Sequence, residues 1–533
     1  MTSYPLNHLI HSLPDYTLSG PANPLITGIV ADSRQVQPGH LFIAFKGFTV
    51  DGHRFIASAI ERGAVAVVVE ADVPVSLPDS MTVLRVPNGR EALAYLAAAW
   101  YGYPSQKMTL IGVTGTDGKT TTTNLIYNIL KQAGRKVSMI STVNAVIGEE
   151  VLDTGFHVTT PDAPEVQRYL AQVVQAGSEV CVLETTSHGL AQHRVTACDF
   201  DLGVVTNITH EHLDIHGSLE AYRLAKARLF EELAQQAAIL NIDDWSYDFL
   251  RERIKGRIPI ISYGLTVGAN VQAQAVAFPP RGRTPFTPLR GVLRGDVPAS
   301  QPAARFETML MGERHIVETP LVGWFNISNT LAALATTVLG LGVAPEIALE
   351  SLRAFKGIPG RMERIDLGQP FTAMVDFAHT PYALRRALET ARGLIPQGDV
   401  PAKQRIIAVF GCAGLRDIKK RTMMGHIAAE LADITIITAE DPRTEDLEMI
   451  IEATARAMRE KGGMEGLTFH CVPDRGRAIY FAAQLAQPGD VVIALGKGHE
   501  QSMCFGSTEY PWDDREAMRS ALLGEPLLTL PTR

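Results

Sequence analysis

Cysteines and long hydrophobic runs are both scarce in this chain. Only five cysteines occur in 533 residues, and no two of them form a CxxC pair. This spacing suggests neither a disulfide framework nor a zinc knuckle, and it fits a reducing cytoplasm. No apolar run approaches the roughly 20 residues of a membrane span, and the N-terminus MTSYPLNHLIHSLPDY lacks a basic start and a signal-like apolar core. We therefore expect a cytoplasmic protein with no membrane partner.

An excess of positive charge is also missing. The chain has 49 Lys and Arg against 57 Asp and Glu, for a net charge of −8. This balance argues against nucleic acid as a partner, and it requires any anionic ligand to be held by local cations. A hydrophobic content of 46% with 20% charged residues is that of an ordinary globular protein. Because 533 residues are too many for one core, we predict about three domains.

The most informative segment is Gly112-Val-Thr-Gly-Thr-Asp-Gly-Lys-Thr-Thr121. A strand-like run at 108–113 leads into it, and a helix-like run at 120–132 leads out. A strand, a glycine turn and a helix in this order present backbone N–H groups and a helix N-terminus to an anion. Lys119 is placed to meet the outer phosphates, and the Thr120 hydroxyl to reach Mg²⁺. The spacing lacks the first glycine of the strict P-loop, but the pattern still predicts a nucleoside triphosphate site.

The order of strand-like and helix-like segments predicts an α/β fold. Residues 1–106 have the pattern of a small α/β unit, 107–358 that of a doubly wound parallel sheet, and 359–533 that of a Rossmann-like domain. Ligands bind at the carboxyl ends of parallel strands, and polar clusters follow predicted strands at 184–189, 207–217, 411–417, 440–443 and 496–500. We interpret the Pro- and Arg-rich segment at about 278–303 as a surface insertion without chemistry.

Several of these polar residues allow more than one interpretation. Histidines 210, 212 and 216 have a spacing that would suit zinc and a hydrolase, or they cap helices. The nucleotide loop favours Mg²⁺ instead, which needs one carboxylate, such as Glu184, besides phosphates and waters. Lys226, taken locally, has the pattern of a solvated helix lysine. Arginines 361, 416 and 443 each stand beside a glycine or proline turn, which favours recognition of carboxylate or phosphate.

The chain resembles the Mur ligases nearly from end to end. The resemblance rests on these motifs in this order: DSR, GTDGKTTT, TTPDA, ETTSHGLAQHR, NITHEHLDIHG, the AK of AYRLAKARLF, FNISN, GRMERI, DFAHTP, EDPRTED and LGKGHE. It implies an ATP-dependent peptide ligase of peptidoglycan precursor synthesis, in which ATP activates the D-Glu of UDP-MurNAc-L-Ala-D-Glu as an acyl phosphate and a diamino acid is added. It also implies a UDP-sugar-binding domain at 1–106, an ATP-binding ligase domain at 107–358 and an amino-acid-binding domain at 359–533. We expect a monomer.

The resemblance also assigns roles to individual residues. The ATP-binding set is Gly115, Thr116, Asp117, Gly118, Lys119, Thr120, Thr121, Asn326, Asn329, Arg361, Asp376 and His379. The UDP-sugar-dipeptide set is Ser33, Thr159, Thr160, Thr186, Gln192 and Arg194. The amino-acid set is Arg416, Glu440, Asp441, Arg443, Gly496 and Glu500. Mg²⁺ would be held by Thr120, Glu184, His212 and a carbamylated Lys226, which reverses the local interpretation of that lysine. Lys119, Lys226 and His212 would be catalytic.

Three motifs depart from the family pattern. Asp117 stands where GTNGKT has Asn, Ala413-Gly-Leu-Arg-Asp417 replaces Gly-Gly-Asp-Arg-Asp, and Glu440-Asp-Pro-Arg443 replaces Asp-Asn-Pro-Arg. Arg443 keeps the guanidinium that suits a side-chain carboxylate, which favours meso-diaminopimelate. Asp441 cannot donate to a carboxylate, so it either receives the ammonium of L-lysine or L-ornithine, or pairs with Arg443.

Three competing functions follow from the same features. Asp117 suggests a non-catalytic, nucleotide-gated interaction protein, and the histidine cluster suggests a zinc hydrolase. An amide ligase that makes another polymer, such as polyglutamate, stays within the class, but the DSR-containing N-terminal region argues against it.

Overall fold

The computed structural model describes residues 2–21, 23–47, 50–71, 77–143, 145–152, 160–209, 216–278, 304–395 and 404–532. The predicted insertion at 278–303 lies outside these ranges except for its first residue. The described chain forms two compact units, Met1–Gln274 with Glu307–His315 and Ser328–Ser351, and Ala275–Phe306 with Ile316–Ile327 and Leu352–Arg533. No helix in the described ranges is long and apolar enough to cross a membrane.

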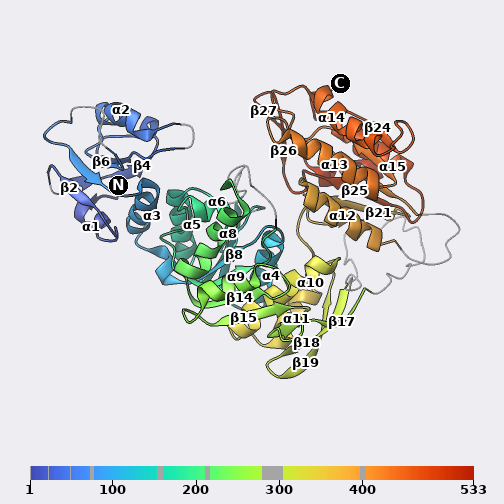
Figure 1. Ribbon diagram of the computed structural model, residues 1–533, viewed down its shortest axis with the longest axis horizontal. Coiled ribbons are helices and arrows are strands. Elements are labelled where there is room, and N and C mark those ends of the chain that lie inside the picture. Colours follow the sequence, from blue (N-terminus) through green and yellow to red (C-terminus); the bar gives the residue numbers. More distant parts are fainter. Residues whose placement is uncertain are drawn as a thin grey trace. The chain divides into compact units, whose positions relative to one another are not determined.

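The N-terminal part of the first unit is built on a five-stranded sheet (Figure 1, blue). Its order is β2 (Thr17–Ser19), β7 (Thr82–Arg85), β6 (Ala66–Val69), β5 (His40–Ile43), β4 (Gly28–Val30), and only β2 is antiparallel. Leu41 and Ile43 of β5 enter one core, whereas Phe42 enters the other, because alternate strand residues face opposite sides. Apolar residues of α1 (Leu6–Ile10) and α3 (Gly89–Trp100) join the first core, and those of α2 (Ile56–Glu61) join the second.

The rest of the first unit is built on a nine-stranded sheet. Its order is β11 (Glu150–Leu152), β10 (Ala145–Ile147), β9 (Val137–Ile140), β12 (Val180–Glu184), β8 (Thr109–Thr114), β13 (Phe200–Val205), β14 (Ala234–Asn241), β15 (Ile260–Gly264), β16 (Val271–Gln272). The seven strands from β9 to β16 in this order are parallel, and β10 and β11 are antiparallel. The described helices of this region are α4 (Lys119–Gln132), α5 (Ala163–Gln175), α6 (Ser187–Ala191), α8 (Leu219–Arg228), α9 (Tyr247–Ile254), α10 (Trp324–Leu334) and α11 (Pro345–Arg353). Helix α10 begins, and α11 ends, in segments that belong to the second unit.

A smaller three-stranded sheet was not predicted from the sequence. It consists of β17 (Gln274–Ala277), β18 (Ala304–Leu310) and β19 (Glu313–Thr319). Along β18, buried residues alternate with more exposed ones, which is typical of a sheet with one covered face.

The second unit contains a six-stranded sheet (Figure 1, orange to red). Its order is β20 (Glu363–Ile365), β21 (Thr372–Asp376), β25 (Val491–Leu495), β22 (Ile406–Phe410), β23 (Ile434–Ile437), β24 (Phe469–Cys471), with only β20 antiparallel. Hydrophobic cores on both faces join it to α12 (Pro381–Gly393), α13 (Ile418–Leu431), α14 (Leu447–Glu460), α15 (Arg475–Leu485) and α16 (Asp514–Leu522). The predicted α/β fold with three sheet domains is confirmed; the residue limits at 106/107 and 358/359 stay predictions.

Candidate active site

The predicted phosphate loop has the expected strand-turn-helix form. β8 ends at Thr114, the loop follows, and α4 begins at Lys119. Gly118 has φ +84°, and a Cβ there would lie 2.3 Å from Asn329 Oδ1, so glycine allows Asn329 of α10 to approach the loop. The Lys119 ammonium donates to the Thr116 carbonyl oxygen at 2.8 Å. The loop therefore places a cation at a helix N-terminus that has no side-chain cap in the described part of the chain.

The loop is anchored by the segment that follows β13. The Asp117 N–H donates to Asn207 Oδ1 at 3.0 Å, while Asn207 Nδ2 and Thr206 Oγ1 donate to the Asp117 carbonyl at 3.0 and 2.6 Å. Thr116 Oγ1 lies 2.9 Å from the Tyr222 hydroxyl of α8. These bonds fix the backbone at Asp117, the first of the three departures from the family motif.

The structure brings together Thr120 and Glu184 of the predicted metal set. Thr120 Oγ1 lies 3.1 Å from each carboxylate oxygen of Glu184, which ends β12 and is only 1% exposed. Lys226 is also 1% exposed, and its Nζ donates to the Gly115 carbonyl at 2.5 Å, so the local interpretation as a solvated lysine is wrong. Oxygen donors on a buried hydroxyl and carboxylate fit a hard cation such as Mg²⁺.

The histidine cluster can be examined only in part. His210 and His212 lie outside the described residues, and His216 Nε2 lies 3.2 Å from Ser187 Oγ. Within the described ranges, no three His, Cys, Asp or Glu residues are grouped as metal ligands. The role predicted for His212 stays a prediction.

Four residues of the predicted UDP-sugar-dipeptide set form one hydrogen-bonded network. Thr160 Oγ1 accepts the Thr186 N–H at 3.0 Å and donates to the Glu184 carbonyl at 3.2 Å. Arg194 donates to the Thr160 carbonyl at 2.6 Å and to Gln192 Oε1 at 2.8 Å. Because Glu184 also belongs to the predicted metal set, this network joins the two sets. Thr159 lies outside the described residues.

Ser33, the remaining member of that set, lies in the N-terminal sheet domain. It begins a short 3₁₀ helix, Ser33–Gln35, after β4, where the Asp32 carboxylate accepts the Arg34 N–H at 2.9 Å. At the same edge of the sheet, the carboxylate of Glu70, after β6, accepts the N–H groups of Lys46 and Gly89 at 2.9 and 2.6 Å. Polar groups thus follow three neighbouring parallel strands, as expected for a ligand site.

His193 links this domain to the central one, and we predict a pH-dependent contribution to stability from it. Asn88 Nδ2, at the start of α3, donates to His193 Nε2 at 3.1 Å. Burial, together with the Arg228 charge, lowers the pKa of His193 to about 4. As the pH falls, His193 is therefore protonated in the unfolded chain before it is protonated in the folded protein. The contribution of neutral His193 to stability is present above about pH 6.5 and is lost as the pH falls towards 4.

We expect His193→Asn to flatten the pH dependence of stability. Asn tolerates the left-handed φ of +58° at this position. Between pH 7 and pH 5, the wild type should lose on the order of 1 kcal/mol more than the variant, after allowance for solvent screening. Chemical denaturation at both pH values measures this, with the exposed His11→Asn as the control. Equal losses in wild type and His193→Asn would contradict the prediction.

Three more residues of the predicted ATP set lie around Phe377 in the second unit. The Arg361 guanidinium lies 4.5 Å from the Phe377 ring centroid, and the His379 ring lies 4.5 Å from the same ring. Asp376 ends β21 and accepts the N–H groups of Met362 and Ala378 at 2.7 and 2.8 Å. The predicted ATP set is thus divided between two clusters, one in each unit, with Asn326 lying on α10 one turn before Asn329.

The predicted amino-acid set lies at the carboxyl ends of β22, β23 and β25, which are neighbours in the sheet. Asp441 and Arg443 both have left-handed backbones, with φ of +38° and +54°, and such strain is typical of functional loops. A Cβ at Gly414 would lie 1.9 Å from the Pro442 carbonyl oxygen, so the departing sequence Ala-Gly-Leu-Arg-Asp keeps the glycine that this close approach requires. The fully buried Arg475 donates to the Ala439 and Leu495 carbonyls and fixes the two strand ends.

The acidic residues of this set have different surroundings. Asp441 does not pair with Arg443: its Oδ1 lies 3.0 Å from Lys497 Nζ. Lys497 also contacts Glu500, at 2.5 Å. Burial raises the pKa of Glu440, whose Oε2 is buried and has no hydrogen-bond partner in the described structure.

Both arginines of the set remain available to bind a carboxylate of a ligand. Arg443 donates to the Gly414 carbonyl at 3.3 Å, and within the described ranges no carboxylate pairs with Arg416 or Arg443. Lys497 was missed by the sequence interpretation although its motif was identified. Two sequence features could have indicated it. Lys497 lies in a glycine turn directly after a buried strand, and an aspartate, Asp441, replaces the asparagine of the family motif.

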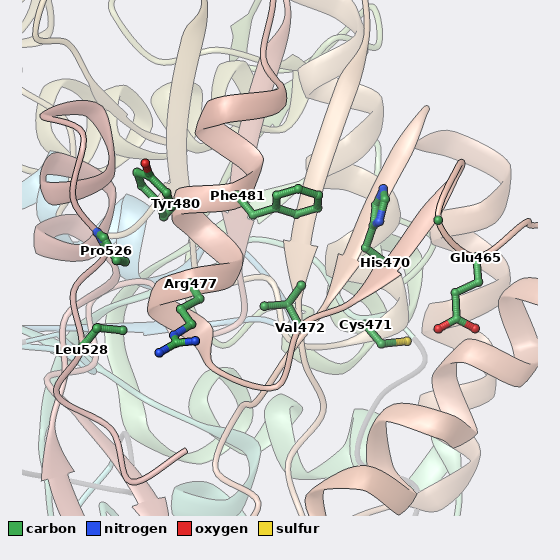
Figure 2. Close-up of a pocket in the computed structure, with 10 residues that line it drawn as sticks. Glu465, His470, Cys471, Val472, Arg477, Tyr480, Phe481, Pro526 and Leu528 are labelled. Atoms are coloured by element: carbon green, nitrogen blue, oxygen red, sulfur yellow. The ribbon is translucent and has the colours of Figure 1, made fainter. Parts of the chain in front are cut away.

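A cavity of about 680 Å³ lies elsewhere in the second unit (Figure 2). It is lined by residues of β24, α15 and the C-terminal segment, with the rings of His470 and Phe481 edge to face at 4.9 Å. None of the predicted site residues lines it. The candidate site therefore depends on the polar clusters at the strand ends rather than on this cavity.

Comparisons with known proteins agree with these clusters. Three domain families match the chain: "Mur ligase family, catalytic domain" at 25–101, "Mur ligase middle domain" at 113–337 and "Mur ligase, glutamate ligase domain" at 360–498. The chain is 40% identical to a UDP-N-acetylmuramyl-tripeptide synthetase of Roseiflexus sp. (strain RS-1), over 97% of this chain and 98% of that protein. It is 39% identical to a UDP-N-acetylmuramoyl-L-alanyl-D-glutamate–2,6-diaminopimelate ligase of Geobacillus thermodenitrificans (strain NG80-2), over 97% and 99%.

A solved structure supports the same assignment. A UDP-N-acetylmuramoyl-L-alanyl-D-glutamate–2,6-diaminopimelate ligase superposes with a TM-score of 0.65 at 29% identity, over 98% of this chain and 99% of that one. The resemblance identified from the motifs is therefore confirmed, and this chain belongs to the Mur ligase family.

Proposed function

We propose that this protein is the ATP-dependent ligase that adds meso-diaminopimelate to the D-Glu of UDP-MurNAc-L-Ala-D-Glu. The observation that carries the choice of amino acid is the pairing of Asp441 with Lys497, which leaves the Arg443 guanidinium without a carboxylate partner in the described structure. An unpaired guanidinium suits the side-chain carboxylate of diaminopimelate, which lysine and ornithine lack. The two relatives that are diaminopimelate ligases support the same substrates.

The first chemical step joins two anions. The D-Glu carboxylate attacks the γ-phosphorus of ATP, the bond to the β-phosphate oxygen breaks, and an acyl phosphate and ADP result. Lys119 and the N–H groups at the start of α4 stabilise the charge on the phosphate oxygens. Mg²⁺, with Thr120, Glu184 and a carbamate on Lys226 as its ligands, would supply further positive charge. The network of Thr160, Thr186, Gln192 and Arg194 orients the dipeptide beside Glu184.

The second step forms the amide bond. The amine of the diamino acid attacks the acyl carbonyl, and the tetrahedral intermediate expels phosphate as the amine loses a proton. Arg443 and Arg416 hold the carboxylates of the incoming amino acid. Glu500 contacts Lys497 through Oε2, and its carboxylate, 39% exposed, also receives an ammonium of the substrate. This arrangement places the reacting amine by binding the other end of the same molecule, so orientation contributes much of the rate.

A product assay tests the proposal. The protein is incubated with UDP-MurNAc-L-Ala-D-Glu, ATP, Mg²⁺ and a panel of amino acids, and products are identified by mass. We expect the diaminopimelate adduct and ADP release that requires both the dipeptide and the amino acid. Incorporation of lysine or ornithine alone would overturn the choice of amino acid. ADP release without ligation, or turnover without ATP, would overturn the ligase proposal in favour of a nucleotide-gated protein or a hydrolase.

Arg443→Ala should erase the preference for diaminopimelate. The variant removes the guanidinium that pairs with the side-chain carboxylate, and a charge-assisted hydrogen bond contributes about 1.5–3 kcal/mol. The ratio of kcat/KM for diaminopimelate to that for L-lysine should therefore fall by about ten- to a hundredfold. Arg456→Ala, on α14 and outside the set, is the matched control. An unchanged ratio in Arg443→Ala would remove Arg443 from amino-acid recognition.

A further inference from the structure

Lys497 is a buried cation held between two carboxylates. Its side chain is 2% exposed, and its Nζ lies 3.0 Å from Asp441 Oδ1 and 2.5 Å from Glu500 Oε2. Burial lowers the pKa of Lys497, but the charges of Glu500 and Asp441 outweigh burial and leave this pKa above its ordinary value. The lysine is therefore charged, and it neutralises acidic groups at the ends of two strands, β23 and β25.

Two hydrogen bonds hold the Asp441 carboxylate in one orientation. Its Oδ1 accepts both the Lys497 ammonium and the Cys504 N–H, each at 3.0 Å. Cys504 belongs to the hairpin of β26 (Ser502–Phe505) and β27 (Thr508–Pro511), whose Cys504 carbonyl also accepts the Arg443 N–H at 3.0 Å. The acid is thus held in place and neutralised by groups of the protein itself, two residues before Arg443.

We propose that Lys497 determines the choice of amino acid by pairing with Asp441, so that the amino-acid site binds a side-chain carboxylate at Arg443 rather than a side-chain ammonium at Asp441. This inference rests on the proposed function. A neutral amide at position 441 would need no counter-charge, whereas an aspartate without Lys497 would present a partly buried carboxylate, 20% exposed, with no counter-charge. Lysine or ornithine could then neutralise that carboxylate with its own ammonium. Lys497 acts through Asp441 and is a positioning residue.

The test compares three variants under the conditions of the product assay. Lys497→Met keeps most of the length of the unbranched side chain and removes its charge. Asp441→Asn combined with Lys497→Met removes both charges of the pair, and Lys461→Met, exposed at the end of α14, is the control. For each protein, kcat and KM are measured separately for meso-diaminopimelate and for L-lysine, and folding is checked by thermal unfolding.

We expect Lys497→Met to shift the kcat/KM ratio towards L-lysine by about ten- to a hundredfold, mainly through KM. The double variant should return the ratio to within a few-fold of wild type, because no acid remains at position 441 to receive the ammonium of L-lysine, and the loss of the Glu500 partner is common to both variants. A merely structural role for Lys497 would lower both activities together, and Asp441→Asn would not restore the ratio. Lys461→Met should leave both substrates unaffected.

Two outcomes would disprove this role of Lys497 and leave the proposed function unaffected. An unchanged ratio in a folded Lys497→Met variant does so, and so does a double variant that fails to recover the wild-type ratio. If Lys497→Met does not fold, the double variant decides alone: it should fold and prefer diaminopimelate, and a preference for lysine overturns the inference. The proposed function fails separately, if the wild type makes no diaminopimelate adduct.

Discussion

Lys119→Ala should abolish ADP formation while the protein stays folded. Lys119 begins α4, and its ammonium lies 2.8 Å from the carbonyl oxygen of Thr116 in the phosphate loop. When the D-Glu carboxylate approaches ATP, this cation offsets the repulsion between the two anions. Loss of one group that stabilises the transition state typically costs on the order of 10²-fold or more in rate. The rate of ADP release in the presence of all substrates measures the effect.

The control for this prediction lies on the same helix. Lys131 is on the last turn of α4, where its Nζ contacts the Tyr127 hydroxyl at 3.3 Å, far along the helix from the loop. Lys131→Ala should retain wild-type turnover, and thermal unfolding should show both variants to be folded. If Lys119→Ala kept activity within a few-fold of wild type, Lys119 would have no part in the mechanism.

Lys226→Ala is expected to be nearly inactive, and a short-chain carboxylic acid added to it should restore part of the turnover. Lys226 is 1% exposed, and its Nζ meets the Gly115 carbonyl at the start of the phosphate loop. Carbamylation would convert this buried amine from a cation into an anionic group whose oxygens can bind Mg²⁺. An added acid can replace that carboxylate-like group but cannot replace an ammonium.

Rescue separates this role from a structural one. A lysine that only donates to Gly115 would, when removed, leave a carbonyl unpaired, and acetate or propionate could not repair that loss. Intact mass spectrometry of the active wild type, under conditions that preserve carbamates, gives a second measurement. A free amine at Lys226 in active, Mg²⁺-loaded protein would disprove carbamylation.

Local sequence patterns were sufficient to predict the elements that carry the site. The phosphate loop could be predicted because a strand, a glycine turn and a helix are set by neighbours within about a dozen residues, and residues 109–132 form them in that order. The polar loops at 411–417, 440–443 and 496–500 could be predicted at strand ends for the same reason, since buried β-strands have a recognisable composition. The three-stranded sheet of β17, β18 and β19 was missed, because its strands flank the Pro- and Arg-rich segment that obscured the pattern.

Only the tertiary structure decided which groups meet. Lys226 has the local pattern of a surface helix lysine, yet it is buried because α8 packs near the phosphate loop, 111 residues away in sequence. Asp441 appeared suited to a substrate ammonium or to Arg443, but its partner is Lys497, 56 residues later, since β23 and β25 both flank β22 in the sheet. Burial and the partner of a charge depend on the order of strands in a sheet, which involves contacts between distant segments. The sequence alone determined the family and the chemistry of the loops, whereas the tertiary structure decided which of their charges are neutralised within the protein and which remain available to a substrate.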